Sequence, residues 1–245
     1  MELIREKTFE PIRKYFPKTR GKPRVDDRRM ISEIVLRTPQ WFEGRDAPKE
    51  LGSYRMLYNR FIRWSKGGVF AKILQKLAKG GTNILMMDAT HLKVHRTAAS
   101  LREGRLSPRQ IGRSKRGLDS KLHVVCDGSG RPVRLLLTAG NVNDIVGARE
   151  LLKDLPDADY LLADKGYDAD WFREELKQRG IEPCIPPMCH RRVQLSYDID
   201  LYKRHHKIEN MFGKLKDWRR IATRYDRCAY TFFSSICIAY FFSFI

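Results

Sequence analysis

The stretches Ile84-Leu85-Met86-Met87-Asp88 and Tyr160-Leu161-Leu162-Ala163-Asp164 share one pattern, an apolar run followed directly by an aspartate. A short apolar run bounded by polar residues is typical of a buried strand. A carboxylate at the end of such a strand is held rigidly at the edge of the sheet. If the two strands are neighbours, Asp88 and Asp164 can reach one metal ion, and carboxylate oxygens are ligands that Mg²⁺ and Mn²⁺ prefer.

Further segments complete the pattern of an α/β domain. The segments with strand character are 84–87, 121–126, 132–138, 160–163 and 181–185, and those with helical periodicity are 143–152, 169–178 and 200–217. Three successive strands, followed by strands that alternate with helices, are typical of a mixed sheet covered by helices. We therefore expect such an α/β domain over residues 81–245.

The first 80 residues have a different texture, in which apolar side chains recur at helical spacing. Arg55, Arg60 and Arg63 share the polar positions of one expected helix, over residues 53–65. We expect a small all-helical domain over residues 1–80, similar to helix-turn-helix DNA-binding modules. Small helical domains of other function show the same pattern.

A basic segment, Lys18-Thr19-Arg20-Gly21-Lys22-Pro23-Arg24, lies within this N-terminal region. Its Gly and Pro residues favour an irregular conformation. The segment is either an arm that lies along phosphates or a solvated loop. Pro11 and Pro17 are expected to interrupt the helical stretch that precedes it.

The charge of the chain indicates a polyanionic partner. Its 245 residues include 48 Lys and Arg against 29 Asp and Glu, a formal net charge of +19. Such an excess attracts nucleic acid, because binding to phosphates releases condensed counterions. The alternatives are a charge that serves solubility or binding to an anionic membrane.

The cysteines and the C-terminus bear on where the protein acts. The five cysteines include no CxxC pair, so a disulfide scaffold is not expected, and Cys184, Cys189 and His190 form only a weak zinc pattern. The apolar run 231–245 is shorter than the ~20 residues of a membrane helix, and we expect a buried closing element. The sequence predicts a cytoplasmic protein with access to the nucleoid and no membrane association.

A third carboxylate, Glu209, lies in the expected helix 200–217. The apolar face of this helix consists of Ile208, Met211, Phe212 and Leu215. Glu209 sits beside that face and could complete a site for two metal ions. An aspartate after a strand is also often a turn residue, and a glutamate among basic residues is often a solvated ion-pair partner. Asp127 is a rival second ligand, although Asp127-Gly128 is typical of a hairpin turn.

Three motifs together resemble the DDE transposases of bacterial insertion sequences, in the insertion-sequence-five branch of the four/five superfamily. They are Met86-Met87-Asp88-Ala89-Thr90-His91, Leu161-Leu162-Ala163-Asp164-Lys165-Gly166-Tyr167-Asp168 and the segment from His206 to Lys216. Leu57-Tyr58-Asn59-Arg60-Phe61 with Arg63-Trp64, and Leu137-Thr138-Ala139-Gly140-Asn141-Val142-Asn143-Asp144, are similar to two further segments of that family.

The resemblance implies an RNase-H-like catalytic core and two Mg²⁺ or Mn²⁺ ions. It also implies cutting and joining of double-stranded DNA at the ends of the element. The family's metal ligands fall on Asp88, Asp164 and Glu209, with Asp88 shared by both ions. Because two DNA ends must be paired, we expect at least a homodimer on DNA.

The last motif of the superfamily contains Tyr, Arg, Glu and Lys at fixed spacing. Tyr202, Glu209 and Lys216 match it, whereas His205 stands at the Arg position and Arg204 precedes it. The candidate DNA contacts are Tyr202, Arg204, Lys216, Arg113, Lys115, Arg116, Arg60 and Arg63, with Arg219, Arg220, Arg224 and Arg227 as further basic residues. Each could also be an ordinary surface or packing residue.

Other functions remain open at this stage. One is an inactive relic that only binds DNA, suggested by His205 and by the poor match of residues 35–52 to the family. Another is a metal-dependent nuclease that cannot join strands, since the same carboxylates serve both reactions. The third is a membrane-associated role, suggested by the aromatic tail.

Overall fold

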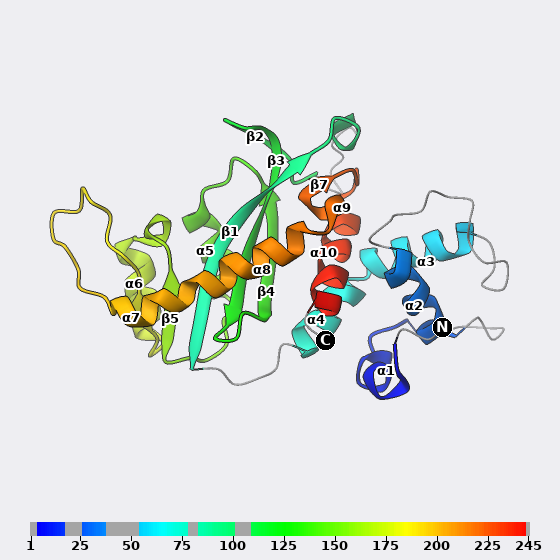
Figure 1. Cartoon of the computed structure of the whole chain (residues 1–245), viewed down its shortest axis with the longest axis horizontal. Coiled ribbons are helices and arrows are strands. Elements are labelled where there is room, and N and C mark those ends of the chain that lie inside the picture. Colours follow the sequence, from blue (N-terminus) through cyan, green and yellow to red (C-terminus); the bar gives the residue numbers. More distant parts are fainter. Residues whose placement is uncertain (1–3, 18–25, 38–53, 78–82, 101–108, 244–245) are drawn as a thin grey trace.

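The computed structural model describes residues 4–17, 26–37, 54–77, 83–100 and 109–243 (Figure 1). The basic segment 18–24, most of segment 35–52 and residues 101–108 lie outside these ranges. Within them the chain forms one mixed sheet with helices on both faces, preceded by a group of helices. The α/β architecture expected from the sequence is confirmed.

The N-terminal helices are amphipathic and bury their apolar sides. They are α1 (Glu6–Arg13), α2 (Asp27–Arg37), α3 (Tyr54–Lys66) and α4 (Val69–Leu77). Pro11 lies inside α1 and does not interrupt it as predicted. A proline in a helix removes one backbone hydrogen bond, and here Phe9 and Ile12 hold the helix by packing into the interior.

The sheet is built around β1 (Ile84–Val94). Antiparallel β3 (Gly117–Asp127) lies on one side of β1, and parallel β5 (Tyr160–Ala163) lies on the other. The remaining strands are β2 (Gly112–Ser114) and β4 (Pro132–Ala139), which pair with β3, then β6 (Glu182–Cys184) beside β5 and β7 (Thr223–Arg224) beside the end of β1.

β1 does not end at Asp88 as the sequence predicted. It continues to Val94, because β3 pairs with it from Leu85 to Lys93. Asp88 therefore lies in the middle of a long strand. β5 ends at Ala163, as expected, and Asp164 follows it directly.

Helices cover the two faces of the sheet with different residues. On one face, Leu85 and Met87 pack with α5 (Asp144–Leu152) and α6 (Asp170–Gln178). On the other, Met86 and Leu92 pack with α8 (His206–Lys216) and α10 (Ala229–Ser243). Side chains alternate along a strand, so this division follows from the sequence of β1. Figure 1 shows α8 crossing the sheet over β1.

The helical region expected over residues 200–217 is present, with one 3₁₀ turn inside it. A short α7 (Ile199–Tyr202) and a 3₁₀ turn (Lys203–His205) precede α8, and the four-residue α9 (Arg219–Ala222) follows it. His205 in the turn is buried against β1. The backbone keeps right-handed helical angles at Lys203, His205 and His206, so the turn tightens the helical path and does not end it.

α10 is the buried closing element that the apolar C-terminal run predicted. It is 15 residues long and apolar on all sides, so it is stable only where other elements surround it. It packs against α3, α4 and α8 and joins the N-terminal helices to the sheet in one core. No helix in the described ranges is long and apolar enough to cross a membrane.

Candidate active site

Asp88 and Asp164 lie at the same level of two adjacent parallel strands. Met87 of β1 is the register partner of Ala163 of β5, and each aspartate follows its partner residue directly. β5 ends at Ala163. On this side Asp88 is therefore flanked not by a strand but by the turn that begins at Asp164. The sequence predicted that the two carboxylates would be neighbours, and the sheet brings them together.

The environment of Asp88 disfavours its charged form. Burial raises the pKa of Asp88 to about 7, against the opposing effect of a 2.7 Å hydrogen bond that the Ala89 N–H donates to its Oδ1. The negative charges of Asp164, Asp144 and Glu209 raise this pKa further. Asp88 therefore sits in a partly buried, electronegative cluster of carboxylates.

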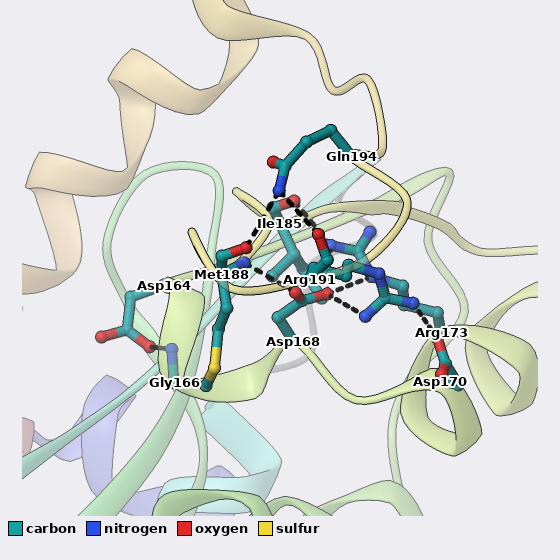
Figure 2. A network of polar contacts seen from close by, with 9 residues as sticks. All are labelled: Asp164, Gly166, Asp168, Asp170, Arg173, Ile185, Met188, Arg191 and Gln194. Atoms are coloured by element: carbon teal, nitrogen blue, oxygen red, sulfur yellow. Dashed lines mark hydrogen bonds and ion pairs between the residues drawn. The ribbon is translucent and has the colours of Figure 1, made fainter.

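Asp164 caps the 3₁₀ turn Lys165–Tyr167. Its Oδ1 accepts a 2.9 Å hydrogen bond from the Gly166 N–H (Figure 2). Burial raises the pKa of Asp164, the Gly166 hydrogen bond lowers it, and the charge of Asp144 raises it. The capping bond fixes the carboxylate at the end of β5 and leaves Oδ2 without a backbone partner among the described contacts.

Glu209 is exposed in the first turn of α8, next to the buried Ile208. Contacts at both ends of this region hold the helix on β1. His205 Nε2 lies 3.3 Å from the Met87 carbonyl oxygen, and Lys216 Nζ donates a 2.6 Å hydrogen bond to Thr90 Oγ1. Met87 and Thr90 flank Asp88 in β1, so α8 is docked directly over the aspartate.

Asp144 is a fourth carboxylate that the sequence analysis did not select as a site residue. It begins α5, and its Oδ1 is 2.9 Å from Lys121 Nζ, which also donates a 2.7 Å bond to the Val142 carbonyl. Its charge raises the pKa of Asp88, Asp164 and Tyr167. The only signal in the sequence was its place in the segment Leu137–Asp144.

Tyr167 adds a polar atom to the same region. Its side chain is 1% exposed, and its hydroxyl has no protein hydrogen-bond partner among the described residues. Burial raises the pKa of this hydroxyl, as do the charges of Asp144, Asp88 and Asp164. The hydroxyl thus lies within electrostatic range of three carboxylates and has hydrogen-bonding capacity that the described residues do not use.

The donor set fits a hard divalent cation. Asp88, Asp164 and Glu209 offer carboxylate oxygens, and the pKa of Asp88 is raised by burial first and by neighbouring negative charges second, both of which a bound cation would offset. No three His, Cys, Asp or Glu side chains in the described part of the chain already stand close enough together to hold an ion. Because Glu209 is exposed, its side chain can move without repacking the core.

The comparisons with known proteins agree with this geometry. Residues 79–242 match the family described as "Transposase DDE domain", and residues 4–74 match the one described as "Putative transposase of IS4/5 family". The chain belongs to the DDE transposases of insertion sequences.

Curated relatives of this DDE transposase carry consistent names. It is 35% identical over 126 residues to a "Putative transposase for insertion sequence element IS6501" from Brucella ovis, covering 50% of this chain and 95% of the relative. It is 31% identical over 176 residues to the corresponding protein for element IS402 from Burkholderia cepacia, covering 66% and 78%. A solved piggyBac transposase synaptic complex has the same fold, with a TM-score of 0.52 at 8% identity over 95% of this chain and 68% of that one.

The candidate DNA contacts of this transposase fall into distinct settings. Arg63 is exposed on α3, Arg204 is exposed before α8, and Lys216 ends α8. Arg113, Lys115 and Arg116 are exposed on β2 and the turn that leads to β3. Tyr202 is half-buried with its ring stacked on His205 at 5.3 Å, and burial raises its pKa to about 12.

Two arginines do not lie on the exposed surface that the sequence suggested. Arg60 is 8% exposed, and its Nη1 lies 3.2 Å from Asp27 Oδ1, so its charge is used within the N-terminal helices. Arg224 is fully buried and donates a 2.7 Å bond to Ser120 Oγ. Each guanidinium is held by an acceptor within the fold, the partly exposed Asp27 for Arg60 and the buried Ser120 for Arg224, so neither is free to bind a phosphate.

The structure also decides two alternatives raised by the sequence. Asp127 accepts bonds at its Oδ1 from Ser129 and from the Arg131 N–H, so it is the hairpin residue and not the partner of Asp88. Cys184 is buried and Cys189 is exposed, and with His190 they form no metal-binding group in the described ranges. The weak zinc pattern has no structural counterpart.

Proposed function

We propose that this transposase binds the terminal inverted repeats of its insertion sequence, cleaves DNA at the element ends and joins the resulting 3′-OH to target DNA. The observation that carries the proposal is the adjacency of Asp88 and Asp164 in an electronegative, partly buried setting. Asp88, Asp164 and Glu209 would hold two Mg²⁺ or Mn²⁺ ions. Such ions, when bound, activate an attacking oxygen and stabilise a leaving one.

The residues of the chain supply positioning and charge. Asp88 lies in mid-strand on β1, and the charges of both Asp164 and Glu209 act on it, so we assign it as the ligand that the two ions would share. Lys216 is held at Thr90, two residues from Asp88, and could neutralise a phosphate oxygen near the carboxylates. Rigid placement of reacting groups accounts for much of the acceleration in phosphoryl transfer.

Double-stranded DNA is the proposed partner. The net charge of +19 favours it, and the exposed basic residues Arg63, Arg204 and Arg116 lie in three separate parts of the chain. Pairing of two element ends would require a homodimer on DNA. A protein that acts on chromosomal DNA would be associated with the nucleoid.

A second candidate, an inactive relic that only binds DNA, is favoured by one observation. His205 stands where the family pattern has Arg, and its ring is buried between Tyr202 and the Met87 carbonyl. From that position it cannot contact a phosphate on the surface. The exposed Arg204 is the residue that could take over such a contact.

The test is an incubation of purified protein and Mg²⁺ or Mn²⁺ with DNA that carries the sequences flanking its gene, with nicks mapped at nucleotide resolution. The matched variants are Asp88→Asn and Asp200→Asn, since the Asp200 side chain is 89% exposed and pairs only with Lys203 among the described contacts. Cuts at the repeat tips that persist in Asp200→Asn and vanish in Asp88→Asn support the proposal. Binding without cutting by the unmodified protein supports the relic instead.

A further inference from the structure

The connection between β6 and α7, residues 185–198, is a long loop whose two ends are tied together. Cys184 Sγ donates a 3.2 Å hydrogen bond to the Asp198 carbonyl oxygen, which closes the base of the loop. The Asp198 carboxylate accepts a 2.8 Å bond from the Leu201 N–H and caps α7. We call residues 185–198 the anchored loop. Figure 1 shows it projecting beyond the end of the sheet at which α6 and α7 lie.

One buried carboxylate holds the middle of the anchored loop. The Asp168 side chain is 1% exposed and accepts 2.8 Å hydrogen bonds from the Met188 N–H and from Arg173 Nε. Arg191 Nη1 adds a 3.0 Å bond to the same carboxylate. Figure 2 shows these donors converging on Asp168 from α6 and from the loop. Asp168 follows Asp164 by one turn of chain, so the loop is fastened directly beside a proposed metal ligand.

Further bonds fix both sides of the anchored loop. Arg173 Nη2 donates a 2.8 Å bond to the Ile185 carbonyl, and Arg191 Nη2 contacts Asp170. Gln194 Nε2 lies 3.3 Å from the Met188 carbonyl and 3.2 Å from the Arg191 carbonyl. A loop with this many internal bonds loses little additional entropy when it binds a partner.

The tip of the anchored loop carries charge that the fold does not use. His190 and Arg192 are exposed, and Val193, which follows Arg192, is 68% exposed. Within the described ranges Arg192 makes no hydrogen bond or ion pair. Residues 185–197 contain no Asp or Glu. The bonds of the loop thus hold a positive, unpaired tip in a fixed position.

We propose that the anchored loop is a preformed contact to the DNA backbone, in which Arg192 binds a phosphate and Asp168 acts as a positioning residue. This inference rests on the proposed function. A polyanion is favoured over a protein partner because the tip has unpaired positive charge and only one large exposed apolar side chain, Val193. The link through Asp168 would place that phosphate at a fixed offset from Asp164.

The first test measures binding of a short fluorescein-labelled DNA duplex as a function of salt. The variants are Arg192→Ala and Arg192→Lys, with Lys153→Ala as the control, since Lys153 is exposed beyond the end of α5, outside the anchored loop, and pairs with Glu150. Loss of one phosphate contact should lower the slope of log K against log salt by about 0.9 and weaken binding roughly three- to tenfold. Arg192→Lys and Lys153→Ala should keep the slope of the unmodified protein.

Three results would overturn the inference in distinguishable ways. If the unmodified protein binds the duplex and Arg192→Ala binds it with the same slope and affinity, the anchored loop is not a DNA contact and the proposed function stands. If the unmodified protein fails to bind any duplex, the proposed function fails together with the inference. A slope lowered equally by Lys153→Ala would show a general charge effect and also count against it.

The second test concerns Asp168, because a positioning role gives an effect opposite to simple electrostatics. Asp168→Asn removes a negative charge and should by charge alone strengthen binding to DNA. We expect weaker binding instead, together with faster hydrogen exchange at the Met188 amide, which Arg192→Ala should leave unchanged. Stronger binding with an unprotected loop would refute the positioning role of Asp168, and the Arg192 result is independent of how well Asp168→Asn folds.

Discussion

Asp88 and Asp164 are brought side by side by the register between Met87 and Ala163 in adjacent parallel strands. Neither strand alone places a carboxylate near another. β1 continues past Asp88, whereas β5 ends before Asp164, so the two aspartates meet where a strand gives way to a turn. The carboxylates therefore share a rigid support, and their mutual repulsion is built into the folded state.

The first prediction concerns the pH dependence of stability. Burial raises the pKa of Asp88 from 3.8 to about 7, so the folded state keeps this proton over a range in which the unfolded chain has lost it. Stability should therefore fall as pH rises from about 4 to 7, and then level off. Asp88→Asn should be more stable than the unmodified protein by on the order of 2 kcal/mol at pH 8, after allowance for partial exposure, and equal to it below pH 4.

Urea unfolding at a series of pH values measures this difference. Asp200→Asn, on an exposed side chain, is the control and should follow the unmodified protein at every pH. Equal pH profiles for Asp88→Asn and the unmodified protein would show that Asp88 is ordinarily ionised.

The second prediction concerns divalent metal. Because the carboxylates around Asp88 repel one another, Mg²⁺ or Mn²⁺ should raise the melting temperature, by an amount that corresponds to about 2.7 kcal/mol at a metal concentration 100 times the Kd. Protons and metal compete for Asp88, so the apparent metal affinity should increase as pH rises through 7. Differential scanning fluorimetry across metal concentration and pH checks both effects. A melting temperature that rises equally in Asp88→Asn would place the metal elsewhere.

The third prediction concerns the buried Arg224. Its guanidinium bonds Ser120 Oγ and the Asp226 carbonyl, at 2.7 and 2.9 Å, and lies over the ring of Phe232. Arg224→Ala should destabilise the protein by about 3 kcal/mol, because it leaves buried acceptors without donors. Arg227→Ala, at an exposed neighbouring position, should change stability by less than about 0.5 kcal/mol. Chemical denaturation of both variants makes the comparison, and similar stabilities would mean that Arg224 is solvated.

The fourth prediction concerns the close contact between α5 and β3. A Cβ added at Gly147 would lie 2.3 Å from Nδ1 of His123, whose side chain is fully buried and bonded to Thr138. Gly147→Ala should therefore destabilise the protein by about 1–3 kcal/mol, although alanine is the better helix former. At Gly213 in α8 an added Cβ meets nothing within 4 Å, and Gly213→Ala should stabilise by about 0.5–1 kcal/mol. The same sign for both variants in thermal unfolding would contradict the packing argument.

Local patterns in the sequence were sufficient for many of the elements. The strand 160–163 was predicted with its observed bounds, and the helices over residues 143–152 and 169–178 differ from α5 and α6 by one residue at their starts. In these segments the apolar residues recur at a regular period and turn residues follow closely. Both features determine the local structure within a few residues of the chain. The same local pattern singled out Asp88 and Asp164, each after an apolar run, whereas their adjacency depends on the pairing of β1 with β5.

Contacts between distant segments decided what the sequence could not. Pairing with β3 extends β1 past Asp88, and the contact of the buried His205 with the Met87 carbonyl oxygen docks the start of α8 on β1. Arg60 has the same local pattern as the exposed Arg63, yet Asp27, 33 residues earlier, draws it inside.

The sequence by itself thus determined the α/β class, the apolar faces and the two strand-associated aspartates, because periodicity and turn chemistry are short-range properties. Only the tertiary structure decided the burial of Arg224, the approach of Asp144 to the site and the anchoring of residues 185–198 by Asp168. Each of these depends on a contact between a charged group and a residue that is distant in the sequence. A local sequence pattern does not contain this information, because the packing of the sheet and helices determines which charged groups are buried together.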